Sequence, residues 1–394
     1  MPAAASRTIL FTVFEPSGDT LAARLIRELK ERDATLMFTG FGGPKMAEAG
    51  ADLIQDTTDH ASIGVSQGIV SEIAGHRARI RLLSQWLQHN DILAHVPVDS
   101  PAANWALCKQ VRRHRPGARI VHLVCPQIWS WASWRIHRLR RLTDHVLCLL
   151  PFEPGWLRER GVKGDFVGHP LFEESAEVLA EPIDTGLPSV GPDGVRLALM
   201  PGSRPGELRL NWETMLRVYL EAERRVPGLV GVVAARKAED RAVLERIASQ
   251  SGLAWPDSLT VEPGRSTEVM HWSDVVLVKS GTSTLQVASM GKPMVAFYNL
   301  ERWKWHGVAR WLIHSRTFVL PNIISEWQGA GRVVTEFVPH FGDPEPIGEA
   351  LLPLLSDSSA RKAQVDGLKR VAGAFAGVDF AQAAADTFLQ ALRA

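Results

Sequence analysis

The sequence predicts an α/β protein with two doubly wound, Rossmann-like domains, each built on a parallel sheet. Apolar runs rich in β-branched residues alternate with amphipathic helical patterns along most of the chain, which favours parallel strands covered on both faces. With 394 residues, the chain is too long for one compact core. Between Glu173 and Asp193 the composition shifts to Glu, Pro, Gly and Ala without periodicity, which indicates a linker between two such series.

The first series is expected to form a domain over residues 1–175. Its expected strands are Ile9–Phe14, one beginning at Met37, Ile92–Val98, Ile120–Val124 and His145–Leu149. The expected helices are Leu21–Arg32, a short one before Gly50, Ile73–His89, Trp105–His114 and a basic one around Arg135–Arg141. Two of the strands lead into polar turns, Glu15–Asp19 (EPSGD) and Asp99–Pro101.

The second series is expected over residues 194–345, followed by an alanine-rich helical tail over 346–394. The expected strands are Val195–Met200, Leu229–Ala234, Val275–Val278, one near Val295, and Thr317–Leu320. The expected helices are Trp212–Arg225, Ala238–Ser251 and Thr284–Met290, the last stopped by a glycine and a proline. Two such domains would face each other across a cleft between two sheet edges, where ligands of doubly wound folds bind.

Charge and hydropathy exclude several classes of protein. Lys plus Arg number 44 against 43 Asp plus Glu, and this balance argues against a nucleic-acid partner. Arginine clusters within 77–81, 112–115 and 135–141 would suit an anionic lipid surface or anionic substrates, although solvated helix faces give the same pattern. The amino terminus lacks the pattern of a signal peptide, and no apolar stretch approaches the 18 or so residues of a membrane span. Any membrane contact is therefore expected to be peripheral.

The three cysteines show neither a CxxC pair nor the spacing of a metal site. Cys108, Cys125 and Cys148 each lie in an apolar context. They are expected to be buried, reduced thiols in a cytosolic protein. No metal and no cofactor are expected.

Two turns of the second series have the composition of an anion-binding site. From Val275 to Val295 the chain reads as a strand, a small polar turn and a helix, and the N–H groups of Gly281–Ser283 suit a phosphate or diphosphate. An ordinary capped turn would use the same residues. Pro201–Glu207 (PGSRPGE) adds small residues and Arg204, whose guanidinium can grip a diphosphate with two hydrogen bonds. Because turns after parallel strands meet at one sheet edge, the pair predicts a nucleotide-diphosphate site that needs no metal.

Seven short motifs follow one another between Glu15 and Asn322. They are the SGD turn, PQIWSW before a basic helix, LPFEP, FVGHPL, LMPGSR, SGTSTL and LPN. In this order they resemble the lipid A disaccharide synthase family. The resemblance implies a GT-B glycosyltransferase, inverting and independent of metal. It implies transfer of 2,3-diacylglucosamine from its UDP derivative to the 6-hydroxyl of 2,3-diacylglucosamine 1-phosphate, with release of UDP and formation of a β-1,6 linkage.

The same resemblance implies partners and a location. The partners would be the UDP-activated acylated sugar donor, the glycolipid acceptor and a membrane surface, with a homodimer among the candidate assemblies. The location would be cytoplasmic, peripherally associated with the inner face of the inner membrane.

The resemblance also implies roles for individual residues. Asp99 matches the first aspartate of the family's IDAPDFN turn and is the candidate general base for the acceptor hydroxyl; an Asx-turn before Pro101 is the alternative. Asp19 is either a substrate contact or a helix N-cap before Thr20. The residues expected to bind substrate are Glu15, Ser17, Gly18 and Asp19 of the first turn, Gly202, Ser203 and Arg204 of PGSR, Ser280, Gly281, Thr282, Ser283 and Gln286 of SGTSTL, and Asn322 of LPN.

Five positions depart from the family pattern. Phe14 stands where glycine is usual, and Ala102 replaces the second aspartate of the IDAPD turn. Gln67 and Gln286 each replace a glutamate; at the second position this loses a charged acceptor for ribose hydroxyls. Lys279 replaces a small residue and adds a candidate phosphate partner. These changes concern one cleft, so they bear on the identity of the substrate more than on the fold.

Two segments combine tryptophans with basic residues. They are residues 301–316 (ERWKWHGVARWLIHSR) and 129–138 (WSWASWRIHR). Such residues suit a membrane interface or an acyl-chain groove, but packing of the tryptophans into a core would account for them equally.

Three other functions remain open at this stage. The chain could be a UDP-N-acetylglucosamine 2-epimerase, which shares the two-domain architecture and a UDP site, but the tryptophan-rich and GHP motifs disfavour this. It could glycosylate another glycolipid. It could also bind a nucleotide sugar or a lipid without catalysis, as Phe14, Ala102 and Gln286 would allow.

Overall fold

The computed structural model describes residues 6–58, 69–180, 186–192, 194–300 and 316–393. The chain forms two compact units. The first unit comprises Met1–Pro170 and Gly377–Ala394, and the second comprises Leu171–Ala376. The chain therefore passes from one unit to the other twice.

The first unit contains a seven-stranded parallel sheet with the strand order β3-β2-β1-β4-β5-β6-β7. Its strands are β1 (Thr8–Thr12), β2 (Met37–Gly42), β3 (Asp52–Asp56), β4 (Ala94–Pro97), β5 (Arg119–Leu123), β6 (His145–Cys148) and β7 (Gly164–Phe166). Its helices are α1 (Pro16–Arg32), α2 (Pro44–Glu48), α3 (Ile69–His89), α4 (Pro101–His114), the 3-10 helix η1 (Ser133–Arg135), α5 (Ile136–Leu142), α6 (Glu153–Arg158) and the late helix α17 (Phe380–Arg393).

The second unit contains a six-stranded parallel sheet with the order β10-β9-β8-β11-β12-β13. Its strands are β8 (Val195–Met200), β9 (Leu229–Ala235), β10 (Leu259–Pro263), β11 (Val275–Lys279), β12 (Met294–Asn299) and β13 (Thr335–His340). Its helices are α7 (Pro170–Ala180), α8 (Pro205–Arg225), α9 (Glu239–Gln250), α10 (Ser266–Trp272), α11 (Thr282–Ser289), α14 (Leu320–Trp327), α15 (Glu345–Ser356) and α16 (Ser358–Gly373).

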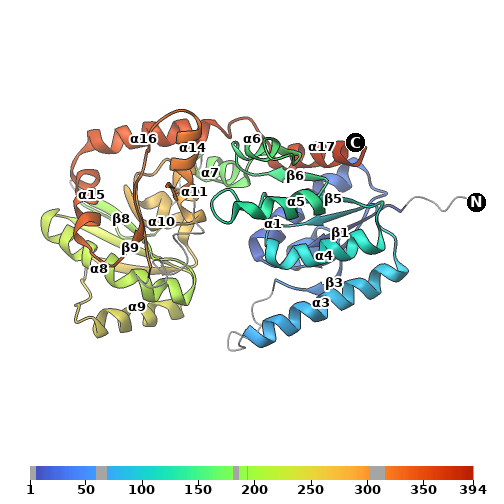
Figure 1. The fold of residues 1–394 in the computed structure, drawn as a ribbon. Coiled ribbons are helices and arrows are strands. Elements are labelled where there is room, and N and C mark those ends of the chain that lie inside the picture. Colours follow the sequence, from blue (N-terminus) through green and yellow to red (C-terminus); the bar gives the residue numbers. More distant parts are fainter. Residues whose placement is uncertain (1–5, 59–68, 181–185, 193, 301–315, 394) are drawn as a thin grey trace, which may run out of the picture. The chain divides into compact units, whose positions relative to one another are not determined.

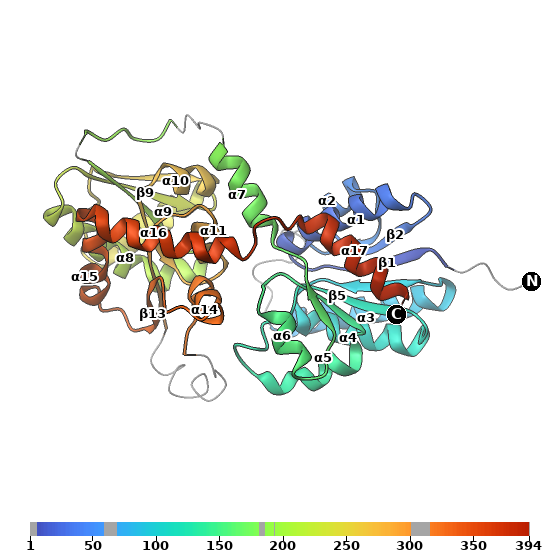
Figure 2. The same ribbon diagram turned by 90° about the horizontal axis from the view of Figure 1, so that it is seen from above.

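Helices cover both faces of each sheet, as the alternating pattern predicts (Figures 1 and 2). Successive residues of β1 illustrate this. Ile9 and Phe11 pack with α1 and α17 on one face, whereas Leu10 packs with α3 and α4 on the other. In the second unit, α8, α9 and α15 cover one face, and α10, α11 and α16 cover the other. Because both faces are buried, the strands read as continuous apolar runs rather than alternating ones.

The predicted helical tail divides between the two units. Helices α15 and α16 pack in the second unit, while α17 belongs to the first and lies beside α1 (Figure 2). Phe380 and Phe388 of α17 are fully buried in the core that α1 and the sheet form. The tail is helical, as its alanine-rich spacing predicts, but it is not one structural part.

Two of the expected elements are wrong. Thr317–Leu320 is not a strand, because Leu320 begins helix α14 and Pro321 occupies its first turn, where a missing N–H costs nothing. The supposed linker from Glu173 begins as helix α7, which Pro170 starts. The apolar pattern of the sequence also failed to predict four short strands, β3, β7, β10 and β13.

Candidate functional site

Four turns lie at the carboxyl ends of the central strands. The strand order reverses between β1 and β4 in the first unit and between β8 and β11 in the second. Ligands of doubly wound sheets bind at this switch point. The turns that the sequence singled out follow these four strands: Phe14-Glu15, Asp99-Ser100, Pro201–Arg204 and Ser280-Gly281. Each unit therefore presents one pair of candidate turns at its own sheet edge.

Asp19 has a structural role that the sequence did not indicate. Its carboxylate is buried and accepts hydrogen bonds from the backbone N–H groups of Gly43 (3.0 Å), Lys45 (3.0 Å) and Met46 (3.1 Å). It therefore caps helix α2. The alternative of an N-cap before Thr20 is wrong, because α1 already begins at Pro16.

The remaining residues of the first turn differ in exposure. Glu15 and Ser17 are exposed, whereas Gly18 is buried where α1 crosses the sheet. A Cβ atom at Gly18 would lie 3.0 Å from Cγ1 of Val13 and 3.3 Å from Cγ1 of Val98. Gly18 thus permits close packing of helix and strand, and the polar side chains that this turn exposes to solvent are those of Glu15 and Ser17.

Asp99 sits in a strained, half-buried turn. Its φ is 44°, and that of Ser100 is 36°, a left-handed conformation that few residues other than glycine adopt. The Asx-turn alternative fails, because it needs an N–H two residues on, and Pro101 has none. Burial raises the pKa of the Asp99 carboxyl, and the negative charge of Glu15 raises it further. The hydrogen bond from the Ser100 N–H lowers this pKa, but the net effect is an increase. The Ser100 hydroxyl donates to Oε1 of Glu15 at 3.2 Å, so the two turns are joined.

A buried polar chain holds the Asp99 turn from below. Asn104 donates from Nδ2 to the carbonyl oxygens of Val98 and Asp99, both at 2.9 Å, and accepts from the Thr12 hydroxyl at 2.6 Å. Nε2 of His95 lies 2.9 Å from that hydroxyl. Burial lowers the pKa of His95 to about 3, so the ring is neutral and donates through its Nε2–H. The strained turn is therefore fixed by neutral hydrogen bonds.

The PGSR turn is organised by Glu207. Its Oε2 accepts hydrogen bonds from the N–H groups of Ser203 (3.1 Å) and Arg204 (3.4 Å). Gly202 has a φ of +113°, and a Cβ atom there would lie 2.6 Å from Glu207 Oε2, so only glycine fits. These N–H groups are therefore occupied by a carboxylate, while the side chains of Ser203 and Arg204 remain exposed.

Lys279 faces the same carboxylate. Its Nζ lies 2.9 Å from Oε1 of Glu207, with the two side chains only 17% and 11% exposed. Burial would raise the pKa of Glu207, but the hydrogen bond and charge of Lys279 and the turn N–H groups lower it overall. The ammonium also lies 5.1 Å from the centre of the Tyr298 ring. Lys279, expected as a phosphate partner, instead neutralises the group that organises PGSR.

The SGTS turn opens helix α11 without a side-chain cap. Gly281 is the N-cap residue, with a φ of 153°, and a Cβ atom there would lie 3.1 Å from Nζ of Lys279. The Thr284 hydroxyl bonds back to the Gly281 carbonyl at 2.8 Å. Thr282 is exposed, and the other side chains expected to bind substrate here are half-buried: Ser280, Ser283 and Gln286. Gly281 has no side chain that could accept hydrogen bonds from the first N–H groups of the helix. Helix starts with such N–H groups commonly bind anions.

Asn322 is fully buried in protein contacts. Its Nδ2 donates to the Val334 carbonyl, and its Oδ1 accepts from the N–H groups of Val333 and Val334, all at 2.8 Å. These bonds tie α14 to the start of β13. We therefore interpret the asparagine of LPN as a structural residue.

The other positions that depart from the family pattern lie in the first unit or outside the described residues. Phe14 is half-buried under the Arg79 guanidinium, and Ala102 is exposed on α4. Gln67 and the segment 301–315 lie outside the described residues. The geometry thus places Lys279 and Gln286 at the SGTS turn, and Phe14 and Ala102 beside the two joined turns of the first unit.

Two parallel doubly wound sheets with polar turns at their switch points define a GT-B type of fold. Solved structures agree in fold. A UDP-GlcNAc 2-epimerase from Neisseria meningitidis bound to UDP-GlcNAc superposes with a TM-score of 0.64 at 13% identity, covering 98% of this chain and 99% of that one. The calicheamicin glycosyltransferase CalG4 superposes with a TM-score of 0.60 at 17% identity, covering 99% of each chain.

Sequence comparison decides between these classes. A model of the lipid-A-disaccharide synthetase family matches residues 9–384. The lipid-A-disaccharide synthase of Burkholderia mallei (strain SAVP1) is 36% identical over 360 residues, 89% of this chain and 88% of that protein. That of Burkholderia pseudomallei (strain K96243) is likewise 36% identical over 360 residues, with the same coverage of both chains. The chain belongs to the lipid-A-disaccharide synthase family, glycosyltransferases of lipid A biosynthesis that use a UDP-sugar.

Two residues that shape the site were not predicted from the sequence. Asn104 lies three residues after the Asp99–Pro101 turn and Glu207 ends PGSRPGE, and neither was assigned a role. A signal for Glu207 was available, because a glutamate at the third position of a helix often bonds back to the N–H groups at the helix start. Asn104 gave no such signal, since its partner Thr12 is 92 residues away.

Proposed function

We propose that this protein transfers 2,3-diacylglucosamine from its UDP derivative to 2,3-diacylglucosamine 1-phosphate, with inversion and release of UDP. Family membership supports the reaction. The observation that supports the catalytic assignment most directly is Asp99, a half-buried carboxylate in a left-handed turn at the switch point of the first sheet. Its oxygens are candidates for taking the proton of the attacking 6-hydroxyl.

The proposed donor site uses the two turns of the second unit. The N–H groups of Ser203 and Arg204 already bond to Glu207. The diphosphate is therefore held by the Arg204 guanidinium and by the start of α11, where Thr282 and Ser283 offer N–H groups and hydroxyls. Gly202, Ser280 and Gly281 allow the backbone to approach, and Gln286 is the candidate partner of the ribose hydroxyls.

The proposed acceptor site uses the first unit. Glu15 and Ser17 offer exposed polar groups beside Asp99. The general base must be ionised when the acceptor hydroxyl attacks, and the nearby Glu15 charge makes the carboxylate more basic. Gly18, Asp19 and Asn104 shape this turn rather than touch the acceptor.

The direct experiment supplies purified protein with the two diacylglucosamine substrates and follows UDP and the disaccharide. Formation of UDP and the disaccharide supports the proposal. The absence of both products overturns it. UDP binding without turnover would indicate the catalytically inactive homologue. UDP release with a different acceptor would indicate another glycolipid. A single light-scattering measurement on the same sample tests the homodimer, which stays a prediction.

Replacing Arg204 with alanine is expected to weaken UDP binding and to raise the KM of the donor about 10- to 100-fold, because a charge-assisted hydrogen bond contributes about 1.5–3 kcal/mol. Lysine at this position should recover part of the affinity, since it keeps the charge and loses the two-pronged contact. The measurement is calorimetric titration with UDP. Arg209→Ala, an exposed change on the same helix, is the control for net charge. Equal effects of the two alanine variants would contradict the assignment.

We further propose that the protein meets the membrane through the first unit. None of the helices in the described parts of the chain has the length and apolarity to cross a bilayer. Trp131 and Trp134 are 44% and 55% exposed, and Arg135 stacks on Trp131 with 4.6 Å between guanidinium carbon and ring centre. Exposed tryptophans with arginines suit the interface of an anionic membrane.

Changing Trp131 and Trp134 together to serine is expected to weaken binding to vesicles containing anionic phospholipid about 10- to 100-fold, because partial burial of the two rings contributes about 1.5–3 kcal/mol in all. Vesicle sedimentation measures this, and added salt should weaken the wild type further. Trp327→Ser, a change at a 52% exposed tryptophan of the second unit, is the matched control. Unchanged sedimentation of the double variant would remove this surface from the proposal.

A further inference from the structure

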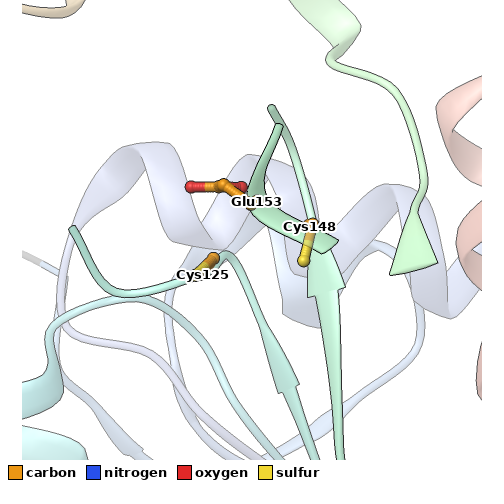
Figure 3. A group of neighbouring side chains, drawn as sticks. All are labelled: Cys125, Cys148 and Glu153. Atoms are coloured by element: carbon orange, nitrogen blue, oxygen red, sulfur yellow. The ribbon is translucent and has the colours of Figure 1, made fainter. Parts of the chain in front are cut away.

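Three side chains with metal-binding atoms meet beside the ends of β5 and β6. Cys125 follows the end of β5 by two residues, Cys148 ends β6, and Glu153 begins α6 (Figure 3). The two Sγ atoms and a carboxylate oxygen all lie within 4.8 Å of one another. All three residues are buried, with exposures of 1%, 0% and 2%. Within the described ranges this is the one group of three or more such ligands.

The distances suit a tetrahedral ion. Zinc holds sulfur at about 2.3 Å and carboxylate oxygen at about 2.0–2.2 Å, which places two sulfur ligands about 3.8 Å apart. The separations of the three ligand atoms are at most 4.8 Å, about 1 Å above this value, and a small side-chain rotation can close such a difference. Two sulfurs and one oxygen form a donor set that favours zinc over the hard ions magnesium and calcium.

The carboxylate already has the outer contacts that metal ligands usually have. Oε1 of Glu153 accepts from the Trp129 Nε1–H at 3.1 Å, and Oε2 accepts from the Leu150 N–H at 3.0 Å. Together with the Leu149 N–H, these donors take up three of the roughly four lone-pair sites of the carboxylate, which leaves one for an ion. Such bonds orient a ligand and tune its affinity.

The Cys125 thiol has the Cys148 thiol and the Glu153 carboxyl as side-chain partners, and an ion bound among the three would replace these contacts. Cys125 donates to the Pro126 carbonyl at 3.6 Å, and Cys148 to that of Val146 at 3.7 Å. The surrounding side chains are apolar, among them Ile128, Ile136 and Leu157. An apolar shell keeps water from competing and strengthens the attraction between an ion and its anionic ligands.

We propose that Cys125, Cys148 and Glu153 bind one zinc ion, with a fourth position left for water or another ligand. Binding replaces the proton of each thiol and that of the Glu153 carboxyl, whose pKa burial raises, and these protons pass to solvent. The ion would tie the ends of two strands to the start of α6 and, through Trp129, to the tryptophan-rich segment. The site is distinct from the proposed transfer chemistry, which needs no metal.

The test uses reduced, chelator-treated full-length protein titrated with zinc, and with cobalt or cadmium as spectroscopic probes. We expect one equivalent to bind, with a thiolate-to-metal absorption band, and two sulfur ligands in the zinc X-ray absorption spectrum. Cys125→Ala and Cys148→Ala should abolish the band, and Glu153→Gln should weaken binding. Trp129→Phe removes one outer hydrogen bond and should weaken affinity about 10- to 100-fold.

Cys108→Ala is the matched control, because Cys108 is buried in a separate core cluster and should not alter the titration. Absorption without sulfur ligands would overturn the proposal, and that measurement needs no variant to fold. A disulfide between Cys125 and Cys148, with no metal uptake after its reduction, would overturn it in favour of a redox pair.

Discussion

Asp99→Asn is expected to lower kcat by roughly 10²- to 10⁴-fold while leaving UDP affinity unchanged. The amide cannot take the proton of the acceptor hydroxyl, and positioned bases contribute an acceleration of about this size. Asparagine also tolerates the left-handed conformation of residue 99, so the turn and its Asn104 contacts should survive. Steady-state turnover and calorimetric titration with UDP separate the two effects. Turnover within a fewfold of wild type would remove Asp99 as the base.

The pH profile gives a second view of the same residue. Because the pKa of Asp99 is raised, kcat/KM should fall as the pH drops through a value above that of an ordinary aspartate. Glu15→Gln removes a negative charge that favours the protonated form, so it should move this acid limb to lower pH. An acid limb that does not move would show that another group governs it.

Glu207→Ala is expected to destabilise the second unit by roughly 2–4 kcal/mol. The change leaves the mostly buried Lys279 ammonium without its carboxylate and the N–H groups of Ser203 and Arg204 without an acceptor. Donor affinity should fall as well, since the PGSR turn loses the bond that shapes it. Denaturant unfolding followed by fluorescence measures the loss.

Two variants make the interpretation specific. Lys279→Met in the Glu207→Ala background should recover a large part of the stability, because the unpaired charge is gone. Glu213→Ala, which removes the exposed partner of Arg217 on the same helix, should cost less than about 1 kcal/mol. If Glu207→Ala and Glu213→Ala lowered the free energy of unfolding equally, burial of the Glu207–Lys279 pair would not contribute to stability.

The architecture was predictable because it depends on local pattern. Apolar β-branched runs such as Val275–Val278 gave the central strands, and parallel connectivity placed the turns after them at switch points. The errors came from competing local signals. Pro321 reads as a helix breaker but occupies the first turn of α14, and Pro170 likewise begins α7, whose glutamate- and alanine-rich sequence was interpreted as a linker.

The chemistry of the site was predictable only where motifs were short and continuous. Asp99 and Arg204 stand in such motifs, whereas the Glu207–Lys279 pair joins residues 72 positions apart through the order of β8 and β11. Cys125 and Cys148 likewise meet only because β5 and β6 pair in one particular register. Spacing along the chain carries no information about such contacts, so the cysteines were predicted to be buried thiols without a metal site, and the Glu207 partner of Lys279 was not predicted.

The place of α17 in the first unit has a consequence for synthesis on the ribosome. The core beneath α1 includes Phe380 and Phe388, which are translated only after all of Leu171–Ala376. Domains usually fold in the order in which they emerge. Here the second unit can complete its core while the first still lacks a helix. The sheet face that α17 covers would stay bare during this interval, and it is there that a nascent chain of this protein would most need a chaperone.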